Sequence, residues 1–158
     1  MVVPKLSYRI QTRLRTGRLQ MAHPDMNALL DESIRLAVLF LEKNGEFFPF
    51  GVTMAPDGTV SHMQGYAGDD QPPSQELIDL LLYGLQTGAS SGDYKSTSLI
   101  YDVRVSLDGE TKTDAISVTL EHRDEHPVTC LVPYTKTTSD IELGEIIAQR
   151  ADRNVFTQ

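Results

Sequence analysis

The sequence contains a single cysteine, Cys130, and no apolar run as long as a membrane-spanning helix. One cysteine excludes an internal disulfide framework and any zinc site built from several cysteines. A bilayer-spanning helix needs roughly 18–20 apolar residues, so the sequence predicts no membrane span. Alternation along its expected strand places Cys130 on the inward side, and we interpret it as a small buried hydrophobic residue rather than a nucleophile.

Familiar motifs of catalysis and nucleotide binding are also missing. The chain has no GxxxxGK[ST], GxGxxG or HExxH pattern and no EF-hand loop. Each of these patterns places backbone amides, carboxylates or histidines around a phosphate or a metal ion. Their absence favours a protein without catalytic activity, and we expect no cofactor.

Basic residues are scarce beyond the first part of the chain. The 14 Lys and Arg residues face 22 Asp and Glu residues, which gives a net charge of −8. Residues 1–23 hold five basic residues and no acidic one, so the remaining 9 basic and 22 acidic residues give residues 24–158 a net charge of −13. An acidic surface repels phosphate, which argues against nucleic acid and against an anionic membrane as partners.

The basic N-terminal arm, residues 1–23, has several interpretations that remain open. Its Arg-rich, acid-free composition is that of an organellar transit peptide, and an extension from a start codon placed too early would look the same. We favour an arm that docks on its own domain or on a neighbouring subunit. The arm lacks the continuous apolar core of a secretory signal, so we expect a cytoplasmic protein. Apolar residues at helical spacing, Leu6, Ile10 and Leu14, favour a helix, although residues 6–10 also alternate as in a strand.

The first strong element of the predicted domain, residues 24–158, is a helix over residues 25–43. Its apolar residues recur at helical spacing, Pro24 suits the first turn, and Asn44-Gly45 provides the stop. Three further apolar residues lie beside or beyond the main stripe, so the second half of the helix is apolar on most sides. These residues are Leu36, Leu39 and Phe40. They are explained by burial between a sheet and another element, or by a dimer interface.

A second helix is predicted over residues 74–87, with Ser74 as its N-cap and Gly88 at its end. Between the two helices, alternation predicts a hairpin of strands at residues 48–54 and 59–63, joined by a type I turn. Pro49 and Gly51 in the first of these strands indicate an edge strand or a bulge.

The rest of the chain has the pattern of an antiparallel meander, with strands at residues 97–107, 114–122 and 128–134. The polar faces of the first two strands indicate that one side of the sheet is solvated or covered by a partner. The tail, residues 139–158, fits a short helix after a capping box or a strand equally well.

This order, αββαβββ, predicts an α+β fold with a single antiparallel sheet of about five strands and two main helices. The element order is similar to that of the profilin-like and roadblock-like α+β modules. Many of these modules pair as dimers or act as sensory or scaffolding domains, so the resemblance in topology implies a role of that kind. A shared topology does not by itself establish a function.

The densest titratable cluster is residues 121–126, with the sequence EHRDEH. Two histidines flanking a turn, His122 and His126, suit a metal site completed by nearby carboxylates, and His62 joins them if its strand lies close. The alternative is a solvated hairpin tip, which we favour. Binding candidates also occur in the longest connection, residues 64–73. They are Tyr66, Asp69 and Asp70, which suit a cation or a basic partner, although acids close to a helix N-terminus have a structural explanation.

Three functions follow from these observations. We favour a small acidic, non-catalytic interaction or regulatory domain that acts as a homo-oligomer, most simply a homodimer, with a protein partner that the sequence does not name. The alternative is a small-molecule-binding or metal-binding domain or an enzyme that uses the three histidines and nearby carboxylates, which must then converge in one pocket. A nucleic-acid binder that uses the basic arm is the least favoured.

Overall fold

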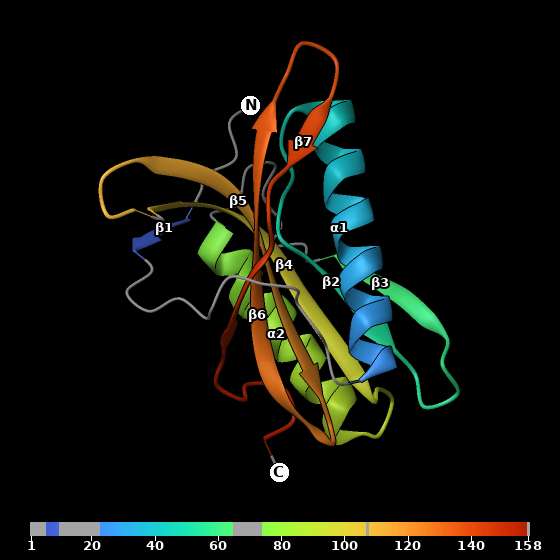
Figure 1. Ribbon diagram of the computed structural model, residues 1–158. Helices are drawn as coiled ribbons and strands as arrows, with labels where there is room; N and C mark the ends of the chain where they lie inside the picture. The colour runs from blue at the N-terminus through green and yellow to red at the C-terminus, as the bar shows by residue number, and fades with distance from the viewer. Residues whose placement is uncertain (1–5, 10–22, 65–73, 107, 158) are drawn as a thin grey trace.

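The computed structural model describes residues 6–9, 23–64, 74–106 and 108–157, which form two helices and eight strands. In chain order the elements are β1 (Leu6–Arg9), α1 (Pro24–Asn44), β2 (Phe50–Met54), β3 (Val60–Gln64), α2 (Ser74–Ser90), β4 (Ser96–Ser106), β5 (Lys112–His122), β6 (Glu125–Lys136), β7 (Ile141–Leu143) and β8 (Ile147–Arg150). The α+β class is therefore confirmed (Figure 1).

Local signals define α1 to within a residue or so of the prediction. Pro24 stands in its first turn, and the His23 side chain caps the helix by accepting a hydrogen bond from the Asp25 backbone N–H, with 3.1 Å between the nitrogens. At the other end Gly45 adopts a φ of 77° and its N–H bonds to the Leu41 carbonyl. A left-handed residue of this kind is what glycine supplies after a last helical turn.

The sheet is larger than about five strands. Its order is β3-β2-β4-β5-β6-β7, while β8 pairs with β6 and β1 pairs with β4. All pairs are antiparallel except β1 with β4. The additional strands come from the two segments with ambiguous patterns: the tail forms β7 and β8, and Leu6–Arg9 of the arm forms β1 where the helical spacing favoured a helix. A strand prevails at Leu6–Arg9 because the edge of β4 at Val103–Ser106 offers it backbone partners; Ile10 and Leu14 lie outside the described residues.

Strand β2 corrects a second expectation. It lies between β3 and β4, so it is not an edge strand. Pro49 precedes the strand and takes no part in its ladder, and Gly51 pairs with Met63 and Leu99 in regular register. A Cβ on Gly51 would lie 3.4 Å from the Ser98 carbonyl oxygen, so the glycine accommodates a close approach rather than a bulge.

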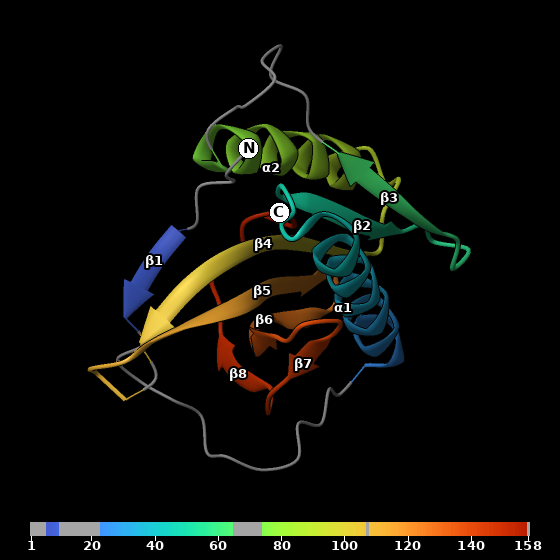
Figure 2. The same cartoon turned by 90° about the horizontal axis from the view of Figure 1, so that it is seen from above.

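The register of β4 on β5 mixes apolar and polar residues on both faces of the sheet. Ile100 of β4 lies opposite Val118 of β5, whereas Tyr101 lies opposite Ser117. Tyr101, on the apolar side of β4, therefore shares a face of the sheet with Ser117, on the polar side of β5. Nearly all of β4 is buried on both faces. The expectation of a solvated or partner-covered face is wrong here, because α1 packs on one face and α2 with the C-terminal segment packs on the other (Figure 2).

Helix α2 extends two residues beyond Gly88, where the sequence predicted its end. The reason is tertiary: the ring of Tyr94 packs so closely on Gly88 that a Cβ there would lie 2.2 Å from it. Gly88 is thus a packing residue rather than a helix stop.

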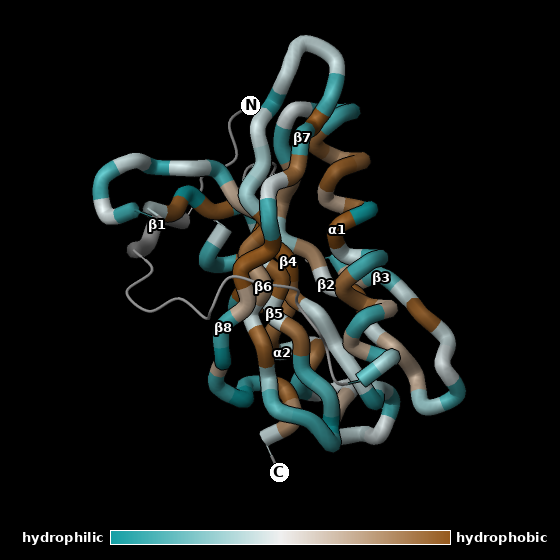
Figure 3. The backbone as a smooth tube through the Cα atoms, in the orientation of Figure 1, coloured by the Kyte–Doolittle hydropathy of each residue, from teal (hydrophilic) through white to brown (hydrophobic). Residues whose placement is uncertain are grey.

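Hydrophobic residues concentrate where α1 and the central strands meet (Figure 3). Cys130 lies fully buried among them, as predicted.

The last described residues are held by a buried acid. Glu121 is 2 % exposed, and its carboxylate accepts hydrogen bonds from the backbone N–H groups of Asn154, Val155 and Phe156, with donor–acceptor distances between 2.9 and 3.3 Å. Arg153 adds bonds to the carbonyls of His122 and Glu125. These bonds place Val155 in the cluster under α2.

Candidate functional site

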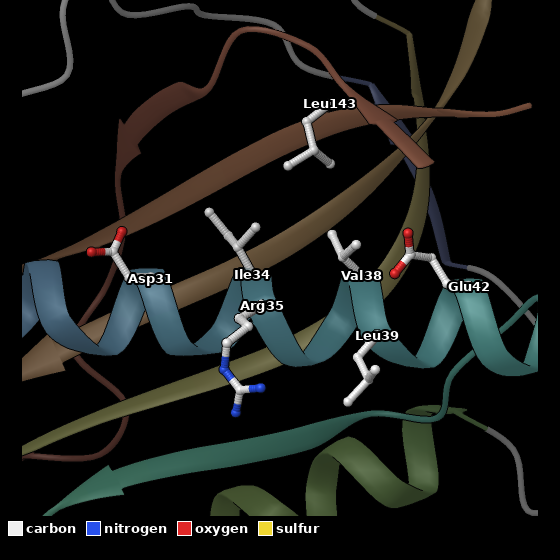
Figure 4. A pocket seen from close by; sticks show the side chains of 7 residues that line it. All are labelled: Asp31, Ile34, Arg35, Val38, Leu39, Glu42 and Leu143. Carbon is white, nitrogen blue, oxygen red and sulfur yellow. The ribbon is translucent and has the colours of Figure 1, made fainter. Parts of the chain in front are cut away.

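An open groove runs along the outward side of α1 beside β7, with a volume of about 440 Å³. Four of its lining residues are apolar, namely Ile34, Val38, Leu39 and Leu143. Leu39 and Leu143 are each 45 % exposed, whereas Ile34 and Val38 are partly buried and pack on the core. Ile34 and Val38 project from α1 on the side of Leu143, while Leu39 lies on the opposite flank of the helix (Figure 4).

Three charged residues complete the groove, but only two of them are without an ion pair. Arg35 is held by Glu32 through two hydrogen bonds of 2.8 Å. Within the described part of the chain, Asp31 and Glu42 make no ion pair. The charge that the groove offers to a partner is therefore negative.

The predicted interface residues have different surroundings. Leu36 is 6 % exposed and belongs to the core. Phe40 is half-buried and packs edge-on against Phe50, with ring centroids 5.4 Å apart. Leu39 is the one of the three whose side chain is largely available to a partner, which agrees with its place beyond the main apolar stripe of the helix.

A second accessible feature is the outer edge of β3, which no described strand covers. The hydrogen bond from the Ala55 N–H to the Thr59 carbonyl fixes the alternation of the β2–β3 ladder, in which every second pair is hydrogen-bonded. Ser61 and Met63 therefore bond inward to β2, and the backbone groups of Val60, His62 and Gln64 face outward. The side chains of these three residues are exposed.

The outer edge of β3 lacks the usual protection against pairing. Native edge strands carry lysine, proline, a bulge or an inward-pointing charge, or they are very short. Strand β3 reads VSHMQ, has five residues in regular register with β2, and contains no Lys, Pro, Asp or Glu. At the opposite end of the sheet, β7 has only three residues.

The three histidines of the metal hypothesis have separate surroundings. His62 Nε2 lies 2.9 Å from Glu32 Oε2 on the surface. His122 is buried, with its Nε2 3.0 Å from Asp25 Oδ2, and His126 is exposed. No metal-competent cluster among the described residues contains two of these three.

Instead His122 meets two residues that the sequence analysis did not consider, His23 and Asp25. One possible ligand atom from each lies within 4.8 Å of the others, and the imidazole rings of His23 and His122 lie with centroids 4.1 Å apart, tilted by 34°. Lys95 approaches the same Asp25 oxygen at 3.4 Å. Burial raises the pKa of Asp25, but the hydrogen bonds from His122 and Lys95 outweigh it and hold that pKa below its ordinary value.

This cluster suits a structural anchor better than a metal centre. The Asp124 backbone N–H donates to His122 Nδ1 over 3.1 Å, so the neutral ring carries its proton on Nε2, the nitrogen that a metal would need. His23 Nδ1 is likewise occupied as the α1 cap, and the Lys95 ammonium stands where a cation would bind. The cluster joins the start of α1 to the β5–β6 hairpin, which the sequence could not indicate because His122 lies 97 residues from Asp25 and still farther from His23.

Two segments match short catalytic sequence patterns, but the secondary structure of each differs from what its pattern requires. Residues 122–126 have the HxxEH spacing of some zinc peptidases, and residues 88–92, GASSG, have the GxSxG spacing of a hydrolase nucleophile turn. The first needs a helix to align its histidines, but it forms the β5–β6 hairpin; the second needs a strand-to-helix turn, but it ends α2. Neither segment has the geometry of its pattern.

The sequence also named three binding residues in the connection before α2 and the single cysteine. Tyr66, Asp69 and Asp70 lie outside the described residues. Burial raises the pKa of the Cys130 thiol to about 12, which agrees with its interpretation as an inert core residue.

Comparison with protein-family models, with curated proteins and with solved structures finds no match. The similarity of element order to profilin-like and roadblock-like modules thus gains no support from a matching structure. Neither described helix has an apolar stretch long enough to cross a bilayer.

Proposed function

We propose that this protein is a non-catalytic interaction domain that acts as a homodimer, and that two copies pair through β3. The observation that carries the proposal is the outer edge of β3, which presents the backbone groups of Val60, His62 and Gln64 without a protecting charge. An edge of this kind is a template for pairing with another strand.

For a second copy as the occupant, β3 is the surface on which charge opposes pairing least. Each chain has a net charge of −8, so two copies repel each other over most of their surfaces. Strand β3 has no acidic residue, and it is therefore a surface where self-pairing costs little electrostatic energy. An antiparallel pair about a two-fold axis uses the same strand from both copies, as a symmetric dimer requires.

The backbone alternation also defines the register. With His62 on the two-fold axis, His62 faces its symmetry mate, and Val60 of each copy faces Gln64 of the other. This register gives about six hydrogen bonds between the chains. Each bond contributes about 1 kcal/mol net, and association costs several kcal/mol of translational and rotational freedom, so we expect a weak dimer that exchanges with monomer at ordinary concentrations.

A matched pair of variants at His62 tests the interface by sedimentation equilibrium between about 5 and 500 µM, a range set by the expected affinity. His62→Pro removes an outward N–H at the centre of the interface while every β2–β3 hydrogen bond remains. His62→Ala removes the same side chain, including its contact with Glu32, and keeps the N–H. We expect the wild type and His62→Ala to dimerise and His62→Pro to be monomeric.

The proposal is wrong if the wild type is monomeric throughout this range, or if His62→Pro dimerises as well as His62→Ala. Circular dichroism and a urea melt of each variant show whether the fold is retained. If His62→Pro is unfolded, Val60→Pro replaces it, because Val60 also directs its N–H outward.

A further inference from the structure

The groove along α1 is not used by β3 pairing, and its chemistry indicates a different partner. Its floor is apolar, with Ile34, Val38, Leu39 and Leu143. Leu39 and Leu143 remain 45 % exposed although they lie beside a packed core. Exposed apolar side chains with a polar rim, here Leu143 on one flank of α1 and Leu39 on the other, are typical of a protein-binding surface.

The two carboxylates of the rim stand at a defined distance from each other along α1. Asp31 and Glu42 are separated by 11 positions on α1, which is about 16 Å along the helix axis. Arg35 lies between them, but the bidentate ion pair with Glu32 neutralises it. The ion pair with Arg35, with a further hydrogen bond from His62, keeps Glu32 ionised and lowers its pKa to about 2, although partial burial opposes this.

We propose that this groove binds a basic amphipathic helix of a partner protein. Apolar residues on one face of that helix lie on the floor beside α1, and basic residues about three turns apart meet Asp31 and Glu42. A helix fits because the groove follows the axis of α1, and helices pack side by side at separations of about 8–10 Å. Carboxylates at the rim exclude a nucleic acid or an anionic membrane as the occupant.

Charge complementarity selects this occupant over a second copy. In residues 24–158 acidic residues outnumber basic ones by 22 to 9, so this surface repels another copy of itself. A basic helix is attracted by the net charge at long range and by Asp31 and Glu42 at short range, while the apolar floor supplies contact area that salt does not screen.

A pair of stapled helical peptides tests the proposal by fluorescence anisotropy on the full-length protein. The first carries leucines along one face and two lysines 11 positions apart, matching the spacing from Asp31 to Glu42. The second has glutamate in place of both lysines. We expect saturable binding of the lysine peptide, and binding of the glutamate peptide at least about tenfold weaker, since two favourable ion pairs become repulsive.

Two double variants with the same change in net charge separate the groove from general acidity. Asp31→Asn with Glu42→Gln removes the rim charges, and Glu76→Gln with Asp79→Asn removes two acids from the exposed face of α2. We expect the first to weaken binding of the lysine peptide at least about fivefold and the second to change it less than about twofold. Leu39→Ser, which removes part of the floor, should weaken it at least about fivefold.

The groove proposal is overturned if the lysine peptide does not saturate, or if the α2 variant weakens it as much as the groove variant does. Self-association that Leu39→Ser abolishes would assign the groove to a second copy and would equally overturn it. The test is independent of β3 when the edge is changed at Val60, because Val60→Pro keeps His62 and its hydrogen bond to Glu32, the partner of Arg35, and should bind the lysine peptide as the wild type does.

Discussion

At the scale of single residues, two carboxylates, the buried Glu121 and the half-buried Asp25, connect distant parts of the chain. The Glu121 carboxylate accepts hydrogen bonds from three successive backbone N–H groups of the C-terminal segment. The Asp25 carboxylate, at the start of α1, lies 3.0 Å from His122 Nε2 and 3.4 Å from Lys95 Nζ. In both cases a carboxylate that is partly or fully removed from water has donors from distant parts of the chain beside it. Hydrogen bonds to charged groups are stronger than neutral ones, and the loss of one partner leaves a buried polar group unsatisfied.

Replacing Glu121 with glutamine should therefore destabilise the protein by about 2–3 kcal/mol. The amide has one acceptor oxygen in place of two, and its NH2 group faces backbone N–H donors. Urea unfolding followed by circular dichroism measures the change. Glu110→Gln, in the exposed turn before β5, is the control and should lie within about 0.5 kcal/mol of the wild type; an equal result for Glu121→Gln would contradict the anchoring role.

A second residue-scale prediction concerns Glu32 in acid. Its pKa is lowered to about 2 from an ordinary value of 4.5, so the folded state binds this proton more weakly than the unfolded state does. The stabilisation is complete above about pH 4.5 and is lost as the pH falls toward 2. Because the pair is partly exposed and screened by solvent, we expect about 1 kcal/mol.

Glu32→Gln should accordingly be less stable than the wild type at pH 7 and should lose less stability on acidification, so that the two unfolding curves converge near pH 2. The measurement is the free energy of unfolding in urea at several pH values. The exposed Glu145→Gln serves as control and should follow the wild type throughout. Parallel pH profiles for Glu32→Gln and the wild type would show that the pair has no effect on stability.

At the scale of elements, α2 contains two glycines with opposite surroundings. A Cβ on Gly84 meets only the Met63 side chain, at 3.4 Å, whereas a Cβ on Gly88 lies 2.2 Å from the Tyr94 ring. Alanine favours a helix over glycine by about 1 kcal/mol. The same substitution should therefore have a small or favourable effect at one site and an unfavourable effect at the other.

We expect Gly84→Ala to change stability by between zero and about +1 kcal/mol, and Gly88→Ala to destabilise by about 1–3 kcal/mol through overpacking. Thermal unfolding of both variants measures the difference, with Gly84→Ala as the matched control. If Gly88→Ala is as stable as Gly84→Ala, Tyr94 moves freely and the end of α2 is not fixed by packing.

At the scale of the whole molecule, the described residues present two accessible surfaces with different chemistry. The outer edge of β3 offers uncharged backbone groups, which suit an identical strand. The groove on α1 offers an apolar floor between two carboxylates, which suits a basic helix. If both proposals hold, the protein pairs with itself through one surface and binds a partner through the other, and so brings two partner molecules together as a scaffold does.

The whole-molecule arrangement predicts a dependence on salt that differs between the two surfaces. Raising the ionic strength screens the repulsion between the two acidic copies, so dimerisation should strengthen by a few-fold between 50 and 500 mM NaCl, whereas binding of the lysine peptide should weaken. Sedimentation and anisotropy at the same salt concentrations measure both. A dimer that weakens with salt would show that ion pairs rather than backbone pairing hold it together.

The sequence by itself determined the α+β class, the positions of α1 and α2 and the burial of Cys130. These features depend on hydrophobic periodicity and on helix-start and helix-end residues such as Pro24 and Gly45, which act within a few positions along the chain. Strand β3 also had a readable signal, because the absence of charge and proline in VSHMQ is visible without a structure, although its place at the edge of the sheet is not.

Only the tertiary structure decided the strand register, the strands at both ends of the chain, the extension of α2 past Gly88 and the role of His122. Each depends on a partner far away in sequence, such as Asp25 for His122, Tyr94 for Gly88 and β4 for β1. Side-chain alternation defines two faces for every strand but does not say which faces lie together, and here the pairing of Tyr101 with Ser117 makes both sides of the sheet part apolar. The groove arises in the same way, because Leu143 lines it only after β7 packs beside α1.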